Sequence, residues 1–130
     1  MTKAKTKPKV LVVDDSATMR EIVGGYLGGN GFEVATATDG RDGLAQLRKD
    51  PSIRLVISDI NMPHMDGLTM AEKIRAELGN AEVRIVMLST EDSTSMRERG
   101  RAAGVNGWIV KPFRGEAVLG PLKKLCGLTA

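Results

Sequence analysis

The sequence predicts one α/β domain built on a doubly wound, five-stranded parallel sheet. Its 130 residues suffice for one hydrophobic core and are too few for two ordinary domains. Five short apolar segments alternate with segments of helical spacing. The short segments are almost continuously apolar, which is typical of strands buried on both faces of a parallel sheet. Right-handed crossovers then favour the strand order 2-1-3-4-5 with five helices.

The predicted strands fix where a functional site should be sought. They are residues 10–13 (VLVV), 33–37 (EVATA), 55–58 (LVIS), 84–88 (RIVML) and 108–110 (WIV). Ligands of doubly wound sheets bind beyond the carboxyl ends of the strands, where the strand order reverses. The residues that follow the first, third, fourth and fifth strands are therefore the first candidates.

Five helices are predicted between and after these strands, four of them from apolar residues at helical spacing. In order, the helices are marked by Met19, Ile22, Val23, Tyr26 and Leu27; by Leu44 and Leu47; by Leu68, Ala71, Ile74 and Leu78; by the polar stretch 92–103; and by Val118, Leu119, Leu122 and Leu125. Asp66 is the expected N-cap of the third helix.

Glycine and proline oppose two of these helix predictions. Gly24 and Gly25 fall inside the first helix, where each costs about 1 kcal/mol relative to Ala, and we interpret them as sites of close packing. Pro121 should kink the fifth helix or confine its regular part.

Composition excludes several classes of protein. With 42% hydrophobic and 27% charged residues the chain fits a soluble globular protein. No apolar run approaches the roughly 20 residues of a membrane span, and no secretory signal is recognised. The single cysteine, Cys126, suits a reducing compartment and is interpreted as a small helix residue. We expect a cytoplasmic protein without membrane insertion.

The positive charge is concentrated at the N-terminus. The net charge is +3, and four lysines (Lys3, Lys5, Lys7 and Lys9) lie in the first nine residues. We interpret residues 1–8 as a flexible basic tail and residues 9–128 as the domain. Nucleic-acid binding would need a folded basic stripe or a known motif, and neither is found.

Polar side chains follow four of the predicted strands. Asp14 and Asp15 follow the first, Asp59 the third, Ser89 the fourth and Lys111 the fifth. Each alone could cap a helix or lie in solvent. Because the carboxyl ends of parallel strands meet at one edge, we expect these side chains to gather in one crevice.

Three carboxylates in one crevice need a proton or a cation. At about 5 Å and an effective dielectric near 20, each pair repels by roughly 3 kcal/mol. An all-oxygen set with few protein ligands favours Mg²⁺, and the lack of a Cys/His cluster argues against zinc. His64, the only histidine, is expected to be solvated. A carboxylate beside Mg²⁺ and Lys111 could attack phosphorus to form an acyl phosphate, while Ser89 donates to a phosphoryl oxygen.

These residues resemble the receiver domain of two-component response regulators. The motifs are VVDDS, SDINMPHMDG, MLSTE and GWIVKPF, and the resemblance covers residues 9 to about 127. The spacing agrees, with 44 residues from Asp15 to Asp59, 30 from Asp59 to Ser89 and 22 from Ser89 to Lys111. The resemblance implies the flavodoxin-like receiver fold. Because no output domain follows, it also implies a stand-alone receiver.

The resemblance assigns a role to each site residue. Asp59 would be the phosphoacceptor, assisted by Lys111 and Ser89. Asp15, Asp59 and the Asn61 backbone carbonyl would bind Mg²⁺, with Asp14 acting largely through water, and no other cofactor is expected. Ser89 and Trp108 would form the switch, in which Trp108 turns inward after phosphorylation, although Trp108 could equally be a core anchor. Asn61 and Glu91 would tune dephosphorylation, and the Lys111–Pro112 bond would be cis.

Among receivers, the chemotaxis type is the most similar. Thr90 and Trp108 depart from it, because smaller residues and Tyr are more usual there. The resemblance implies a histidine kinase as phosphodonor, a target such as a flagellar motor switch component and a phosphatase. The target would bind the face of the fourth helix, fifth strand and fifth helix. The protein would be a monomer. It would be no enzyme in the usual sense, since it would catalyse only its own phosphorylation and dephosphorylation.

Three alternatives stay open from the sequence. The receiver could serve a phosphorelay or a pathway other than chemotaxis. A metal-dependent aspartyl-phosphate phosphatase would need a second acid where Asn61 stands, and a cap segment. A flavodoxin-like cofactor binder would need a phosphate loop after the first strand, where Asp14 and Asp15 would repel phosphate.

Overall fold

A five-stranded parallel sheet forms the centre of the computed structural model, which describes residues 7–127. The strands are β1 (Lys9–Val13), β2 (Glu33–Ala37), β3 (Ile53–Ser58), β4 (Arg84–Ser89) and β5 (Gly107–Val110). They lie in the order β2-β1-β3-β4-β5, and every neighbouring pair is parallel. The predicted fold class and strand order are confirmed.

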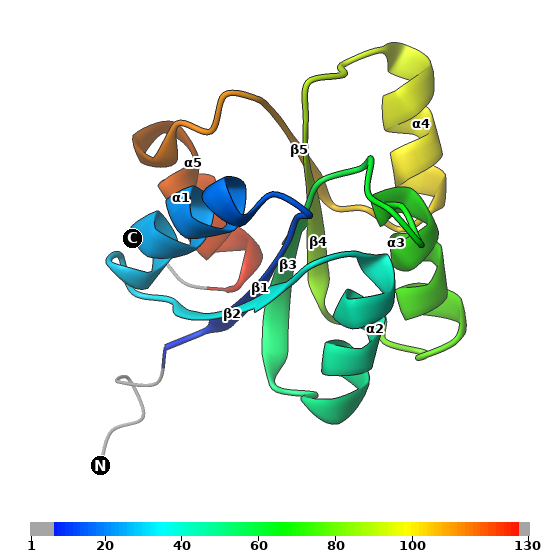
Figure 1. Ribbon diagram of the computed structural model, residues 1–130, viewed down its shortest axis with the longest axis horizontal. Coiled ribbons are helices and arrows are strands. Elements are labelled where there is room, and N and C mark those ends of the chain that lie inside the picture. Colours follow the sequence, from blue (N-terminus) through cyan, green and yellow to red (C-terminus); the bar gives the residue numbers. More distant parts are fainter. Residues whose placement is uncertain (1–6, 128–130) are drawn as a thin grey trace.

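Helices cover both faces of the sheet. They are α1 (Ala17–Gly28), α2 (Gly40–Lys49), α3 (Gly67–Ala76), α4 (Thr94–Ala102) and α5 (Gly115–Leu125). Figure 1 shows α1 and α5 on one face and α2, α3 and α4 on the other. None of these helices is long and apolar enough to cross a membrane.

The strands are apolar on both sides because both faces of the sheet are buried. Side chains alternate along a strand, so Leu11 and Val13 face the core under α2 and α3, whereas Val10 and Val12 face the core under α1 and α5. All four are at most 2% exposed. This double burial explains the continuous apolar runs that predicted a parallel sheet.

Side-chain caps begin four of the helices. Ser16, Asp39, Asp66 and Ser93 each accept a hydrogen bond from the backbone N–H three residues later, which satisfies a donor without a partner in the helix. The predicted cap at Asp66 is confirmed. Ser89 is not a cap, because α4 begins after Ser93, and its hydroxyl stays available to the crevice.

The structure corrects three expectations about the helices, in whole or in part. Ile22 is 49% exposed, because α1 buries Val23 and Leu27 and its narrow buried stripe excludes Ile22. A Cβ on Gly24 would lie 3.2 Å from Val34 Cγ1, but one on Gly25 would meet no atom within 4 Å, so close packing explains only Gly24. α5 runs through Pro121 from Gly115 to Leu125, so this proline does not confine the regular part of the helix, and the kink stays a prediction.

The two ends of the domain meet the amino ends of the strands. Lys9, one of the lysines at the N-terminus, belongs to β1, and its Nζ lies 2.5 Å from Asp50 and 3.6 Å from Glu33. Cys126 is buried directly after α5, as a structural cysteine would be. Residues 1–6 of the expected tail lie outside the described residues, so the boundary between tail and domain stays a prediction.

Candidate functional site

The candidate site lies at the carboxyl ends of the strands, where backbone bonds continue one residue past the strand ends. The Asp14 N–H donates to the Ala37 carbonyl (3.1 Å), and the Asp59 N–H donates to the Val13 carbonyl (3.0 Å). The Lys111 N–H donates to the Ser89 carbonyl (2.8 Å). These bonds hold the first residue after each strand in the plane of the sheet, so its side chain has a fixed origin.

Three predicted acids meet in this crevice. Asp14, Asp15 and Asp59 each offer a carboxylate oxygen within 4.8 Å of the others. Asp14 is 3% exposed, Asp15 is exposed, and Asp59 lies between these extremes. The cluster is thus buried at its base and open to solvent at its rim, where an ion or a phosphoryl group could enter.

The buried acid is electrostatically unfavourable. Burial is the main reason why the pKa of Asp14 is raised, and the nearby carboxylates of Asp59 and Asp15 raise it further. The Ser16 N–H, which donates to Asp14 Oδ1 at 2.9 Å, and the Lys111 ammonium act in the opposite direction. A cation bound among the acids would relieve the same repulsion.

Lys111 brings a positive charge to the predicted phosphoacceptor. Its Nζ lies 3.7 Å from Asp59 Oδ1, and both side chains are largely buried, with exposed fractions of 22% and 15%. The Ile60 N–H donates to the same Asp59 oxygen at 2.8 Å. The Lys111–Pro112 bond is cis, as the resemblance implies.

Ser89 is joined to Trp108 through the backbone of Glu91. The Ser89 hydroxyl, on a residue 2% exposed, accepts a hydrogen bond from the Glu91 N–H at 2.9 Å. The carbonyl of Glu91 in turn accepts from the Trp108 indole N–H at 2.9 Å. A displacement of the hydroxyl would therefore act on the residue that holds the indole.

Other predicted site residues line the rim. Asn61 and Glu91 are exposed, in the β3–α3 and β4–α4 loops respectively, and Thr90 is exposed beside Ser89. His64 is 58% exposed in its side chain, but it is not simply solvated, because its Nδ1 lies 2.8 Å from Asp39. The Asp42 N–H, and then His64, lower the pKa of Asp39. This contact joins the loop after Asp59 to the start of α2.

Sequence reasoning missed several contacts around these residues. Arg20 Nη1 donates to the Asp14 carbonyl at 2.7 Å, which ties α1 to the crevice. The guanidinium of Arg97 lies over the Trp108 ring, 5.8 Å from its centroid. Gly100 packs against the same ring, and its place inside a helix was the one sequence signal that could have marked it.

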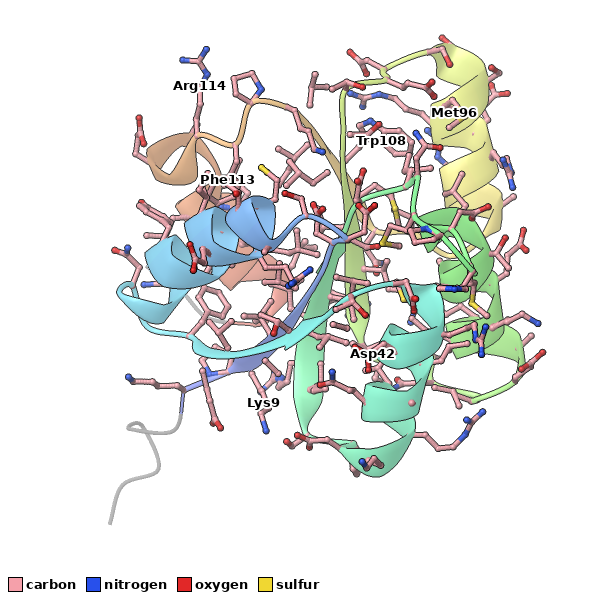
Figure 2. The ribbon with its side chains drawn as sticks, in the orientation of Figure 1. Lys9, Asp42, Met96, Trp108, Phe113 and Arg114 are labelled. Atoms are coloured by element: carbon pink, nitrogen blue, oxygen red, sulfur yellow. The ribbon has the colours of Figure 1, made fainter. Side chains whose placement is uncertain are left out.

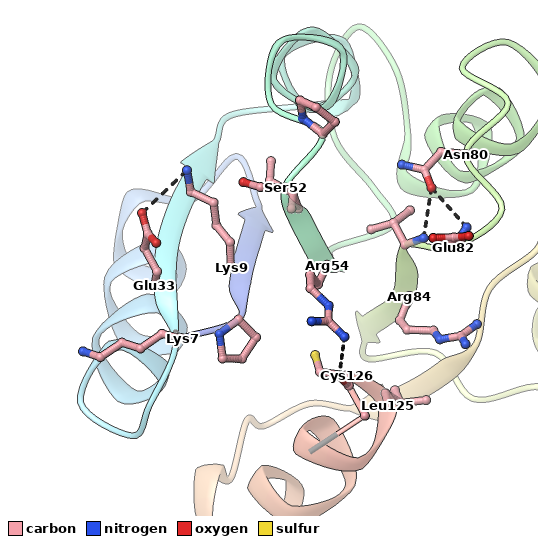
Figure 3. A pocket seen from close by; sticks show the side chains of 15 residues that line it. Lys7, Lys9, Glu33, Ser52, Arg54, Asn80, Glu82, Arg84, Leu125 and Cys126 are labelled. Carbon is pink, nitrogen blue, oxygen red and sulfur yellow. Dashed lines mark hydrogen bonds and ion pairs between the residues drawn. The ribbon is translucent and has the colours of Figure 1, made fainter. Parts of the chain in front are cut away.

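A cavity away from these residues lies at the amino ends of the strands. It measures about 970 Å³ and is lined by charged residues that include Lys9, Arg54 and Glu33 (Figure 3). Lys9 pairs with Glu33, and Arg54 Nη2 donates to the Cys126 carbonyl at 2.7 Å. Lys9, Glu33 and Arg54 thus form contacts within the protein. The cavity is lined by none of the predicted site residues.

The donor set fits a hard divalent cation. Asp14, Asp15 and Asp59 supply only oxygen, and the Lys111 ammonium leaves the cluster with a net negative charge. Oxygen ligands on one side of an ion, with solvent on the other, suit Mg²⁺, which retains several waters. No other group of three or more metal-ligating side chains is found within residues 7–127.

Comparisons with known proteins agree with this geometry. The response regulator receiver domain family matches residues 10–122. The chain is 38% identical over 120 residues to the chemotaxis protein CheY1 of Helicobacter pylori, covering 92% of this chain and 97% of CheY1. The chemotaxis response regulator CheY4 of Vibrio cholerae has a similar structure, with a TM-score of 0.85, 41% identity, and 92% of this chain and 99% of CheY4 covered. A CheX–CheY–BeF3–Mg²⁺ complex from Borrelia burgdorferi matches with a TM-score of 0.84, 29% identity and coverage of 91% and 88%.

Proposed function

The chain belongs to the response regulator receiver family, and we propose that it is a stand-alone chemotaxis regulator phosphorylated on Asp59. Residues 9–128 would form the receiver and residues 1–8 a basic tail. The single observation that supports the chemistry best is the acidic cluster itself, with Lys111 Nζ 3.7 Å from Asp59. An acid that must react with phosphorus needs a positive neighbour and a fixed position, and Asp59 has both.

The reaction would transfer a phosphoryl group from a histidine kinase. An Asp59 oxygen would attack the phosphorus of a phosphohistidine, the P–N bond would break, and the histidine nitrogen would leave with the electron pair and take up a proton. Asp15, Asp59 and the Asn61 carbonyl, with Asp14 largely through water, would hold Mg²⁺, which would supply positive charge for the phosphoryl oxygens. Lys111 would add a second positive charge on the same oxygens, and the Ser89 hydroxyl would donate a hydrogen bond.

The exposed residues Asn61 and Glu91 would set how fast the acyl phosphate is hydrolysed. Both lie at the solvent side of the crevice, where attacking water must pass. The protein would catalyse no reaction beyond its own phosphorylation and dephosphorylation. The alternative, a phosphatase acting on separate substrates, would be favoured by turnover of a phosphate ester.

The output would pass from Ser89 to Trp108. In the free crevice the Ser89 hydroxyl accepts a hydrogen bond from the Glu91 N–H. When this hydroxyl donates to a phosphoryl oxygen, it would move away from that N–H. The Glu91 carbonyl accepts a hydrogen bond from the indole N–H. A shift of Glu91 would therefore change how the protein is distributed between the two positions of Trp108. Phosphorylation would favour an inward position of the ring.

The face of α4, β5 and α5 would bind the target. Val110 on β5 is 39% exposed, and an apolar groove between β5 and α5 is lined by Trp108, Ile109 and Pro121, among others. Basic residues on the flanking segments would favour an acidic peptide or helix, and they are Arg97, Arg99, Arg101, Arg114, Lys123 and Lys124.

The partners follow from this assignment. A histidine kinase would supply the phosphoryl group, and a flagellar motor switch component would be the target. A phosphatase would be a third partner, since a Borrelia CheY is found in a complex with CheX, BeF3 and Mg²⁺. The protein would act in the cytoplasm as a monomer, without binding nucleic acid.

Radiolabelled transfer from candidate histidine kinases tests the phosphoacceptor. Wild type should be labelled only with Mg²⁺, and Asp59→Ala should lose the label completely because the attacking oxygen is gone. Asp15→Asn should lower labelling strongly through loss of the metal. Label that persists in Asp59→Ala at the wild-type level would rule out Asp59.

Lys111→Ala tests the coupling between chemistry and output. Labelling should continue at a reduced level, because the acid and the metal ligands remain, but the Trp108 fluorescence change with acetyl phosphate and Mg²⁺ should disappear. Lys49→Ala, a substitution of the same kind at an exposed position at the end of α2, is the matched control. Pull-down with wild type should capture the target only after phosphorylation. A phosphotransfer protein captured in place of a motor component would favour a phosphorelay.

A further inference from the structure

We propose that Gly100 and Arg97 are positioning residues that hold the Trp108 indole against α4 and so set the sensitivity of the switch. The inference rests on the proposed function of Trp108, but it concerns contacts that exist without phosphate. Both residues lie on α4, three positions apart and hence on one side of the helix. Figure 2 shows Trp108 beside this helix.

Gly100 provides the space for the ring. A Cβ built on Gly100 would lie 2.9 Å from Trp108 Cζ3 and 3.5 Å from Cε3, and the side chain of Leu68 on α3 is the next contact at 3.7 Å. Gly100 is buried in the middle of α4, and it is not among the glycines with positive φ. Its backbone conformation therefore gives no reason for glycine, whereas the indole does.

Arg97 contacts the Trp108 indole on the face of its ring. Its guanidinium lies over the indole, and the same group forms an ion pair with Asp92, which precedes the N-cap of α4. The ion pair limits where the guanidinium can go and directs it to the ring, where the positive charge is attracted by the π electrons. Arg99 and Arg101 are exposed on the same helix.

Three contacts thus fix one position of the indole. The ring edge meets Gly100, the ring face meets Arg97, and the N–H donates to the Glu91 carbonyl. The third contact leads to Ser89 through Glu91, whereas the first two come from α4 alone. A change on α4 should therefore alter how often the indole is packed against this helix without altering the chemistry at Asp59.

Indole N–H exchange with solvent measures this position directly. The chain has one tryptophan, so ¹⁵N-labelled protein gives a single indole signal. In the unphosphorylated protein Gly100→Ala should raise the exchange rate by about tenfold, because its Cβ competes with the ring for the same space. Arg97→Ala should raise the rate by about two- to fivefold through the lost cation–π contact, and Arg97→Lys should restore part of it.

Matched controls separate positioning from general effects. Gly25→Ala makes the same change in another helix where the Cβ meets no atom within 4 Å, and Glu98→Ala removes an exposed charged side chain of α4. Both should leave the indole exchange rate within about twofold of wild type. Phosphorylation of Asp59 by acetyl phosphate should proceed at the wild-type rate in Gly100→Ala, Gly25→Ala and Glu98→Ala, since none of these residues lies in the acidic cluster.

The outcomes distinguish this inference from the proposed function. Exchange rates of Gly100→Ala and Arg97→Ala that equal those of the controls would overturn the inference, whatever phosphorylation does. If Gly100→Ala fails to fold, Arg97→Ala alone decides, because it changes a side chain at the surface. A wild-type indole signal that does not respond to acetyl phosphate and Mg²⁺ would contradict the role of Trp108 in the switch, while the variants would still report its position.

Discussion

At the scale of single residues, the crevice depends on small groups as much as on charged ones. Gly67 begins α3 at the end of the loop that follows Asp59, and its N–H donates to the Ile60 carbonyl at 2.8 Å. A Cβ at this position would lie 2.2 Å from the Asp59 carbonyl oxygen and 3.0 Å from Ser58 Oγ. The loop after Asp59 can therefore close only over a residue without a side chain.

Gly67→Ala adds only one methyl group, but it should both destabilise the fold and slow the labelling of Asp59. The Asp59 backbone would have to shift, so we expect a loss of about 1–3 kcal/mol in the free energy of unfolding and markedly slower labelling by acetyl phosphate. Urea unfolding and the labelling rate measure the two effects. Gly120→Ala, whose Cβ meets no atom within 4 Å, should change neither by much. Wild-type stability and labelling in Gly67→Ala would show that the Asp59 backbone is not held as described.

At the scale of elements, one ion pair joins the start of β1 to the end of α2. Asp50 is the C-cap of α2, and the hydrogen bond from Lys9 is the main reason why its pKa is lowered to about 2. The hydroxyl and the N–H of Ser52 lower it further. The ordinary value for this carboxyl is 3.8, so the folded protein binds a proton at Asp50 less readily than the unfolded chain does.

The stability from Asp50 should therefore depend on pH in the acid range. It is fully present above about pH 4, and it is lost as the pH falls towards 2 and the folded carboxyl takes up its proton. Asp50→Asn should make the urea midpoint fall less steeply between pH 4 and pH 2. Glu98→Gln, on the exposed part of α4, serves as the control. An unchanged slope in Asp50→Asn would mean that the pair with Lys9 does not form in solution.

Most elements could be predicted from sequence because each leaves a local pattern. Strands buried on two faces are continuously apolar, and Asp66 marks the start of α3. The ends of parallel strands then bring Asp14, Asp59 and Lys111 together without further information. Contacts between distant helices leave no such pattern. Ile22 has helical spacing but is exposed, and the packing of Gly100 on Trp108 depends on where α4 lies relative to β5.

At the scale of the whole molecule, the acids make the free protein less stable than its core alone would allow. Burial and neighbouring carboxylates raise the pKa of Asp14, which means that its charged form is disfavoured in the fold. An ion that binds only the folded crevice should shift the balance towards the native state.

Mg²⁺ should therefore raise the melting temperature, and a chelator should reverse the change. At a concentration one hundred times its dissociation constant the ion adds about 2.7 kcal/mol to the free energy of unfolding. Differential scanning calorimetry with and without millimolar Mg²⁺ measures the effect, and Asp14→Asn and Asp59→Asn should respond much less. Melting that is insensitive to Mg²⁺ in the wild type would contradict a metal site in the crevice.

The position of β5 at the border of the sheet has a consequence for how a signal can leave the protein. β3, which ends beside Asp59, lies between β1 and β4, whereas β5 pairs only with β4 among the residues that the structure describes. A local rearrangement of β5 disturbs the backbone ladder with one neighbour and spares the rest of the sheet. We therefore expect β5 to change its position at a lower cost in free energy than β3, which holds Asp59 at the centre of the sheet.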